Sequence, residues 1–335
     1  MKIAIYKDTL GNGRGADAAT AALAEGLSDR GHEVSLFTDD GAGFPGSPFP
    51  VCTFSAERMG QCDVIVSTGV NELLSLAAKM PQGCPPVLQQ FHTRPRHVFK
   101  WKHPLRNRRI AAALRNVSTI QVLRPEFADE VRRIAPEVSV AVIGNWSVGA
   151  SSCAPSREDA QSILCPGALN KDKNQELLIR SFGRVAHSFP EWTLDICGVG
   201  KPAWENRLRR LAERCAGSQI RFHGYCDLLP FYARCSFVAL PSLDEAFPLI
   251  LIDAASFGKA AVTAHDWIGA AKAEGGVVSR PSVGAFAECL SQLMSDSSLR
   301  RQLGEKARLF CLDRYSRDRI LDEWERVLAS VSKVN

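Results

Sequence analysis

Long apolar runs are missing from this 335-residue sequence, although 45% of its residues are apolar. No stretch approaches the roughly 20 apolar residues that a transmembrane helix needs, so we expect no membrane span. The start, MKIAIYKD, has only a short apolar run before charged residues return. We expect it to form a first strand and not a signal peptide, and the overall apolar content excludes a disordered chain.

The 11 cysteines never stand in a C-x-x-C arrangement. A zinc site or a redox pair is therefore not indicated. Most of the cysteines occur in apolar segments, as Cys165, Cys197 and Cys235 do, where small buried thiols are common. We expect the protein to work in a reducing cytoplasm.

Acidic residues are missing between Glu72 and Glu126, a window that contains ten Lys and Arg. Removing those ten from the 41 basic residues leaves 31 against 36 acidic ones, so the net charge of +5 depends on this window. Aromatic residues are interleaved with its charges, which favours an anionic membrane surface or a phosphorylated acceptor. A solvated basic face and a nucleic-acid site are the alternatives, and we expect no nucleic acid. The candidate surface residues are Arg94, Arg96, Lys100, Lys102, Arg106, Arg108 and Arg109.

The length exceeds what one hydrophobic core usually fills, so we expect two domains. Strand patterns alternate with helical ones along the chain, which indicates an α/β fold with mainly parallel sheets. The stretch SVGASSCAPSRED has no apolar period and is typical of a linker. The expected parts are a first domain at 1–148, a linker at 149–160, a second domain at 161–315 and a last helix at 316–335.

Two carboxylates eight residues apart frame a predicted helix start in residues 241–259, PSLDEAFPLILIDAASFGK. The preceding SFVALPS is typical of a buried parallel strand that ends in a loop. Glu245 should lie in that loop, Pro248 in the first helical turn and Asp253 about two turns in. Because ligands of open α/β sheets bind where strands end and helices begin, we expect an anionic ligand here. Otherwise Glu245 is a capping acid and Asp253 a solvated side chain.

This segment resembles the donor-site signature of retaining glycosyltransferase family 4, the group 1 glycosyltransferases. The shared residues are Pro241, Ser242, Glu245, Phe247, Ala254 and Gly258, and the departures are Ala246, Pro248 and Asp253. The resemblance implies that Glu245 contacts the donor sugar or its phosphate. It also implies that Asp253 contacts the ribose, and that the donor site is lined by Ala246, Phe247, Pro248 and Leu249.

A second segment, CPGALNKDKNQELLIRSF, resembles the first strand and helix of the same family's donor domain. Lys173 matches the lysine that holds the donor diphosphate. An ammonium there would compensate the charge that develops on the leaving group. Ala168 replaces the family arginine, and Lys171 is a candidate substitute without the planar fork of a guanidinium.

Four further sites follow from the same resemblance. Gly198 and Gly200 match a turn under the nucleotide, and Tyr225 and Cys226 follow the strand whose end meets the base. Gly13 and Gly15 match a loop that approaches the donor phosphate, and His92 matches a histidine that touches the donor sugar. Tight turns and ordinary packing are the alternatives.

The resemblance implies the GT-B fold: two Rossmann-like domains with a cleft between them and a C-terminal helix that crosses back to the first domain. It implies a retaining hexosyltransferase that moves a sugar from a nucleotide sugar, preferably UDP-linked, to an acceptor of lipopolysaccharide, capsule or a related surface glycan. The sequence has no D-x-D, so we expect neither a metal nor another cofactor. We expect a cytoplasmic protein, peripheral on the inner face of the plasma membrane.

Two other hypotheses about the function remain open at this point. A catalytically weak sugar-nucleotide-binding or scaffold protein would keep the fold. A dinucleotide enzyme would use Gly11, Gly13 and Ala16 as G-x-G-x-x-A, with Asp39 at a later strand end. That fingerprint does not follow its strand directly, and it explains nothing after residue 150.

Overall fold

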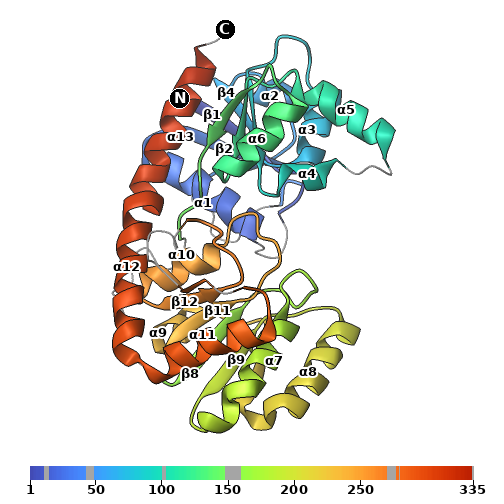
Figure 1. Cartoon of the computed structure of the whole chain (residues 1–335). Helices are drawn as coiled ribbons and strands as arrows, with labels where there is room; N and C mark the ends of the chain where they lie inside the picture. Colours follow the sequence, from blue (N-terminus) through green and yellow to red (C-terminus); the bar gives the residue numbers. More distant parts are fainter. Residues whose placement is uncertain are drawn as a thin grey trace. The chain divides into compact units, whose positions relative to one another are not determined.

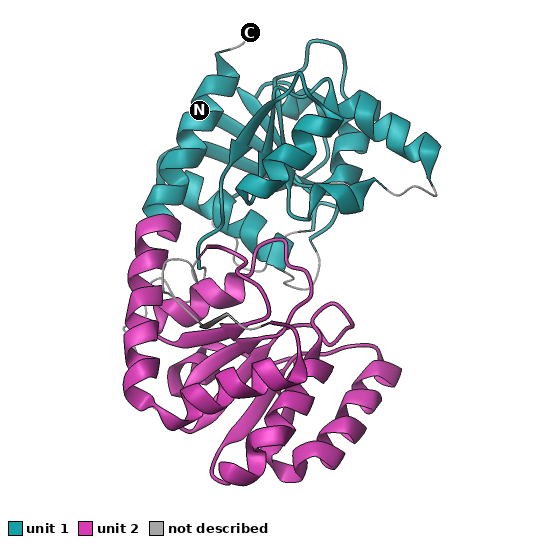
Figure 2. Cartoon of the chain, in the orientation of Figure 1, with its two compact units in different colours: residues 1–148, 317–335 teal, residues 149–316 magenta. Residues whose placement is uncertain are grey.

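The chain divides into two compact units in the computed structural model (Figures 1 and 2). Unit 1 comprises residues 1–148 and 317–335, and unit 2 comprises residues 149–316. The structure describes residues 1–10, 15–42, 49–99, 103–147, 160–269, 277–278 and 280–333. All but the last residue of the expected linker 149–160 therefore lies outside the described residues.

Unit 1 contains a seven-stranded parallel sheet in the order β3-β2-β1-β4-β5-β6-β7. Its strands are β1 (Lys2–Tyr6), β2 (Glu33–Thr38), β3 (Val51–Thr53), β4 (Val64–Ser67), β5 (Val87–Phe91), β6 (Thr119–Val122) and β7 (Ser139–Val142). Its helices are α1 (Gly15–Asp29), α2 (Ala56–Met59), α3 (Val70–Lys79), α4 (Pro95–Val98), α5 (Pro104–Leu114), α6 (Pro125–Ile134) and α13 (Arg317–Ser332).

Unit 2 contains a six-stranded parallel sheet in the order β10-β9-β8-β11-β12-β13. Its strands are β8 (Ser162–Pro166), β9 (Thr193–Cys197), β10 (Ile220–Gly224), β11 (Phe237–Leu240), β12 (Ala260–Thr263) and β13 (Val277–Val278). Its α-helices are α7 (Gln175–Val185), α8 (Pro202–Ala216), α9 (Leu229–Arg234), α10 (Leu249–Ser256), α11 (Val283–Ser295) and α12 (Ser297–Tyr315), and the 3₁₀ turns are η1 (Ala186–Ser188) and η2 (Gly217–Gln219).

The two sheets share one topology. In each, the first strand in sequence has the second on one side and the fourth on the other. The chain therefore leaves in opposite directions from two neighbouring strands, β1 and β4 in unit 1, and β8 and β11 in unit 2. Ligands of open α/β sheets bind in the crevice at the carboxyl ends of such a strand pair, the switch point. Each unit thus provides one candidate crevice.

Side-chain alternation along β8 creates a core on both faces of the unit 2 sheet. In β8, Ile163 and Cys165 pack into one buried cluster, whereas Leu164 packs into another. Successive side chains of a strand point to opposite faces, so a strand covered by helices on both sides must be apolar throughout. This explains the continuous apolar run SILCP.

The last helix, α13, belongs to unit 1, where it packs against α1, β4 and β5. Leu321, Trp324 and Leu328 of α13 are buried. Gly26 of α1 lies so close that an added Cβ would meet Leu321 Cδ2 at 2.8 Å. The prediction of two Rossmann-like domains with a helical C-terminus is confirmed.

Candidate functional site

A lysine and a glutamate meet at the switch point of unit 2. Lys173 follows β8, and Glu245 lies between β11 and α10. The distance from Lys173 Nζ to Glu245 Oε1 is 2.6 Å, and the side chains are 24% and 8% exposed. A charge-assisted contact this short, at a strand edge where ligands bind, fixes the ammonium in the crevice. The structure thus brings together the two residues that the sequence singled out in separate motifs.

Backbone contacts hold the loop that carries Lys173. The Lys173 N–H donates to Asn170 Oδ1 at 3.0 Å, and Asn174 adopts the left-handed conformation with φ 51°. The Leu243 N–H donates to the Asp172 carbonyl at 2.7 Å. This last bond joins the loops after β8 and β11, so the positions of Lys173 and Glu245 are set together.

Gly198 and Gly200 allow a second loop to pack against the Lys173 loop. A Cβ added at Gly198 would lie 1.9 Å from the Gly167 carbonyl oxygen, and one at Gly200 would lie 2.2 Å from that of Leu169. The Leu169 N–H also donates to the Val199 carbonyl at 2.9 Å. Close approach of two backbones requires glycine. The predicted nucleotide turn is therefore also a support for the lysine loop.

The start of α10 differs from the sequence prediction. Pro248 is the N-cap residue, with φ −82° and ψ 83°, and the first helical residue is Leu249. The prediction of Pro248 in the first turn is therefore wrong, because its ψ is not helical. Asp253 is the fifth residue of α10, so it lies just over one turn in and not two.

Two residues of this segment are engaged in packing. The ring of Phe247 is 9% exposed and packs edge-on against Tyr315, with centroids 5.3 Å apart. Asp253 is half-buried near Tyr232 of α9. The pKa of the Tyr232 hydroxyl is raised mainly because the group is buried, and in second place because the Asp253 carboxylate is close. Ala246 is half-buried at the same strand end.

The other predicted donor residues lie on neighbouring strand ends. Lys171 is exposed in the Lys173 loop, and the Ala168 carbonyl there accepts from Gln175 Nε2 at 3.0 Å. Tyr225, after β10, is 77% exposed. Cys226 packs against the buried cluster that contains Cys197. Burial is the main cause that raises the pKa of Cys197.

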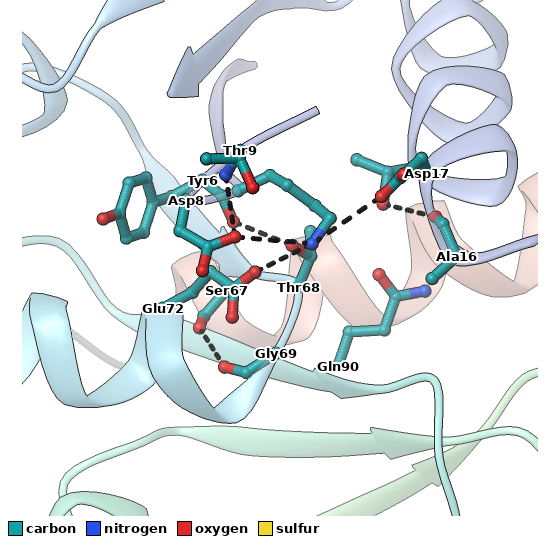
Figure 3. A network of polar contacts seen from close by, with 12 residues as sticks. Tyr6, Asp8, Thr9, Ala16, Asp17, Ser67, Thr68, Gly69, Glu72 and Gln90 are labelled. Carbon is teal, nitrogen blue, oxygen red and sulfur yellow. Dashed lines mark hydrogen bonds and ion pairs between the residues drawn. The ribbon is translucent and has the colours of Figure 1, made fainter. Parts of the chain in front are cut away.

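A second charged cluster, which the sequence analysis missed, occupies the switch point of unit 1. Lys7 follows β1, and its Nζ lies 3.0 Å from Glu72 Oε1, 3.7 Å from Asp8 Oδ1 and 3.8 Å from Asp17 Oδ1. Figure 3 shows Asp8, Asp17 and Glu72 converging from three segments. Burial is the main cause that raises the pKa of Glu72, and the neighbouring Lys7 opposes it. The available signal was position, because Lys7 follows the first strand and Glu72 the fourth, as Lys173 and Glu245 do in unit 2.

His92 follows β5 and lines a pocket together with Lys7, Asp8 and Glu72 of this cluster. Burial, with a smaller effect of Lys7, lowers the pKa of His92 to about 4. The imidazole is therefore neutral near pH 7 and either donates or accepts a hydrogen bond at each nitrogen. Gly15 begins α1 beside the pocket residue Ala16, whereas Gly11 and Gly13 lie outside the described residues.

The basic window separates into residues with different surroundings. Arg94 Nε lies 2.7 Å from Glu130 Oε1, and its guanidinium lies over the Phe127 ring. Arg106 lines the unit 1 pocket and donates to the Val98 carbonyl at 3.2 Å. The exposed members are Arg96, Arg108 and Arg109, while Lys100 and Lys102 lie outside the described residues.

The described residues offer neither a cluster of metal-ligand side chains nor a helix that could span a membrane. In these parts of the chain, no three His, Cys, Asp or Glu side chains gather in a way that would hold a metal ion. Within the same residues, every helix is too short or too polar to cross a bilayer.

The sequence is similar to an exopolysaccharide phosphotransferase and to a lipopolysaccharide core biosynthesis glycosyltransferase. It is 33% identical over 184 residues to an exopolysaccharide phosphotransferase of Streptomyces coelicolor, covering 51% of this chain and 19% of that protein. It is 25% identical over 228 residues to the lipopolysaccharide core biosynthesis glycosyltransferase LpsE of Rhizobium meliloti, covering 64% of this chain and 65% of that one. The chain thus spans less than two thirds of the length of these curated relatives.

The fold is similar to that of solved glycosyltransferase structures. HepE of Anabaena in complex with UDP superimposes with a TM-score of 0.82 at 16% identity, over 98% of this chain and 100% of that one. WaaG, a glycosyltransferase involved in lipopolysaccharide biosynthesis, superimposes with a TM-score of 0.75 at 16% identity, over 97% and 99%. Residues 154–310, which include both Lys173 and Glu245, match the family model of glycosyl transferases group 1. The chain therefore has the GT-B fold, and its residues 154–310 are similar to the group 1 glycosyl transferases.

Proposed function

We propose that the protein is a retaining glycosyltransferase that moves a hexose from a UDP-sugar to a sugar acceptor of a surface glycan. The observation that carries this proposal is the Lys173–Glu245 contact of 2.6 Å at the unit 2 switch point, inside the residues that match the group 1 family. The UDP complex of HepE and the lipopolysaccharide role of LpsE support the choice of donor and product.

The reaction needs charge compensation on the leaving group. The bond between the anomeric carbon and the diphosphate oxygen breaks, and a bond from that carbon to the acceptor oxygen forms. The acceptor hydroxyl proton passes to the departing phosphate oxygen. Lys173 stabilises the negative charge that develops there, and Glu245 orients the ammonium and contacts the donor. Because the lysine supplies this charge, we propose that the reaction needs no metal.

Substitution of the two residues tests the proposal. Lys173→Met and Glu245→Gln should each lower the turnover of UDP-sugars at least about 100-fold, since a preorganised donor group contributes this much to a charged transition state. Release of free UDP in the presence of a membrane glycan extract measures the rate. Lys333→Met, at an exposed position after α13, is the control and should lose less than about threefold. Unchanged rates in the first two variants would contradict the assigned roles.

A scaffold protein of the same fold is the second candidate, because Ala168 removes an arginine that the resembled family carries. Calorimetry against UDP-, GDP- and ADP-sugars, followed by acceptor addition, separates the two. Binding without nucleotide release would favour the scaffold. We also propose that the enzyme acts at an anionic membrane surface on the cytoplasmic side, supported by the exposed arginines of α5.

A further inference from the structure

Asn174 has a strained backbone at the switch point of unit 2. Its φ and ψ are 51° and 39°, the left-handed conformation, and it is the N-cap residue of α7. Among the described residues other than glycine, only Gln161 also has positive φ. The conformation is unfavourable for any residue with a Cβ, although asparagine tolerates it better than most. Such strain persists only where surrounding contacts maintain it, and it is often found where a residue has a function.

The side chain of Asn174 does not cap the helix that it precedes. An N-cap asparagine usually accepts a hydrogen bond from an N–H of the first helical turn, and Asn174 makes no such bond in the described part of α7. Its Nδ2 instead donates to the Pro241 carbonyl at 3.3 Å. Pro241 is buried and follows β11 directly. The side chain therefore joins two loops and does not stabilise the start of α7.

Asn174 is one of three consecutive residues that join the loops after β8 and β11. The three contacts are those of the Asp172 carbonyl with the Leu243 N–H at 2.7 Å, of Lys173 Nζ with Glu245 Oε1 at 2.6 Å, and of Asn174 Nδ2 with the Pro241 carbonyl at 3.3 Å. The first joins two backbones, and the second is the ion pair itself. Of the three, the third alone depends on a side chain outside that pair. Lys173 stands between the other two residues in the sequence, so its backbone is restrained from both sides.

We propose that Asn174 is a positioning residue for the transferase reaction: its amide holds the loop after β8 against the end of β11 and thereby places the Lys173 ammonium. The assignment rests on the proposed function, in which Lys173 stabilises the charge of the leaving group. A preorganised charge acts only when its geometry is held, and a displacement of about 1 Å can cost about 100-fold in rate. Removal of the amide should therefore slow the chemical step more than it weakens donor binding.

The substitution Asn174→Gly in the full-length protein tests the proposal. Glycine adopts the left-handed conformation without strain, and this gain offsets the lost hydrogen bond. The midpoint of urea unfolding should therefore stay within about 0.3 M of the wild-type value. The kcat for UDP release from a UDP-sugar, with the membrane glycan extract as acceptor, should fall at least about tenfold, while KM changes less than about threefold. An unchanged kcat would overturn the proposal.

The matched control is Gln161→Gly. Gln161 has φ 50° and is exposed at the amino end of β8, the end opposite to Lys173. This variant removes the same kind of strain without touching the loops at the switch point, so its kcat should equal that of the wild type. Equal losses of kcat in the two variants would also overturn the proposal, because glycine at either position would then slow the enzyme.

Acetylation of Lys173 gives a readout that needs no turnover. Loss of the Asn174 amide should loosen the ion pair with Glu245, and an amine outside an ion pair reacts faster because its neutral form is less disfavoured. Lys173 should therefore react with acetic anhydride at least about threefold faster in Asn174→Gly. Mass spectrometry measures the labelling, with the exposed Lys333 as internal reference. An unchanged labelling rate would contradict the positioning role, whereas a wild-type protein that turns over no UDP-sugar would count against the proposed function.

Discussion

His92 shows how burial of one side chain links stability to pH. Its pKa in the folded state is about 4, below the value of about 6.5 for a free imidazole. The unfolded chain therefore binds a proton between these two values while the folded one does not. Stability is full above about pH 6.5 and is lost as the pH falls toward 4.

Urea unfolding at pH 7 and pH 5 measures this effect. The wild-type chain should lose about 2 kcal/mol more than His92→Gln over this interval, as a 2.5-unit difference in pKa requires. His187 is exposed, so His187→Gln is the control variant. Its loss of unfolding free energy between pH 7 and pH 5 should equal that of the wild type. Identical pH responses of wild type and His92→Gln would show that His92 does not titrate in this way.

Gly198 shows how the backbone of one residue supports the site. It has φ +153° and faces the Gly167 carbonyl. Gly198→Ala should lower the free energy of unfolding by at least about 2 kcal/mol. Two costs add up here: the backbone strain of an alanine at this φ, and the clash of its Cβ with the neighbouring loop. The substitution should also weaken UDP binding, since the Lys173 loop must shift.

Gly31 is the comparison for this substitution. It also has positive φ, of +84°, but nothing lies within 4 Å of an added Cβ. Gly31→Ala should therefore cost only about 1 kcal/mol, the strain of positive φ alone. Equal destabilisation of the two variants would remove the argument from loop packing.

Among the elements, α5 has exposed apolar and basic side chains on its surface. Leu105 is 74% exposed at its start, and Arg108 and Arg109 are exposed further along. An apolar tip beside arginines suits the boundary of an anionic bilayer. Flotation with vesicles that contain 30% anionic lipid should recover the wild-type protein, and Leu105→Gln/Arg108→Glu/Arg109→Glu should abolish recovery.

The control for this experiment comes from α8. Arg210→Glu/Arg214→Glu changes the net charge equally on another exposed basic helix and should leave flotation unchanged. Vesicles of neutral lipid should recover neither the wild type nor the variants, because an arginine gains its contribution of about 1 kcal/mol only near an anionic surface. Equal losses for the α5 and α8 variants would mean that net charge, and not α5, determines binding.

At the scale of the whole molecule, one topology occurs twice with different chemistry. Lys7 meets Glu72 at 3.0 Å in unit 1, and Lys173 meets Glu245 at 2.6 Å in unit 2. If nucleotide binding belongs to unit 2, UDP at 100 times its Kd should stabilise that unit by about 2.7 kcal/mol. Thermal unfolding with and without UDP should show this shift in wild type and in Lys7→Met but not in Lys173→Met. A shift lost in Lys7→Met would contradict the division of roles.

Much of the fold could be predicted from the sequence. Strands such as IAIY in β1 and FVAL in β11 are apolar throughout, because both faces of a parallel sheet are covered. The helices between them followed from their periodicity. The start of α10 was misplaced, since proline at 248 satisfies a first-turn position and an N-cap position equally well by its φ alone.

The candidate site was only partly readable. Motifs marked Lys173 and Glu245 one by one, but their 2.6 Å contact depends on the order of β8 and β11 in the sheet. Lys7, Asp17 and Glu72 belong to no motif, so the only available signal was the position of Lys7 and Glu72 after the first and fourth strands. Each looked like an ordinary polar residue beside a strand or helix.

By itself the sequence determined the alternation of strands and helices, the two-domain organisation and the family resemblance, because these depend on local periodicity and short motifs. Tertiary structure alone decided which charges meet. Lys7 and Glu72 are 65 residues apart in the chain, and Lys173 and Glu245 are 72 apart. Their contacts form only when parallel strands align their carboxyl ends at one edge, which no local pattern encodes.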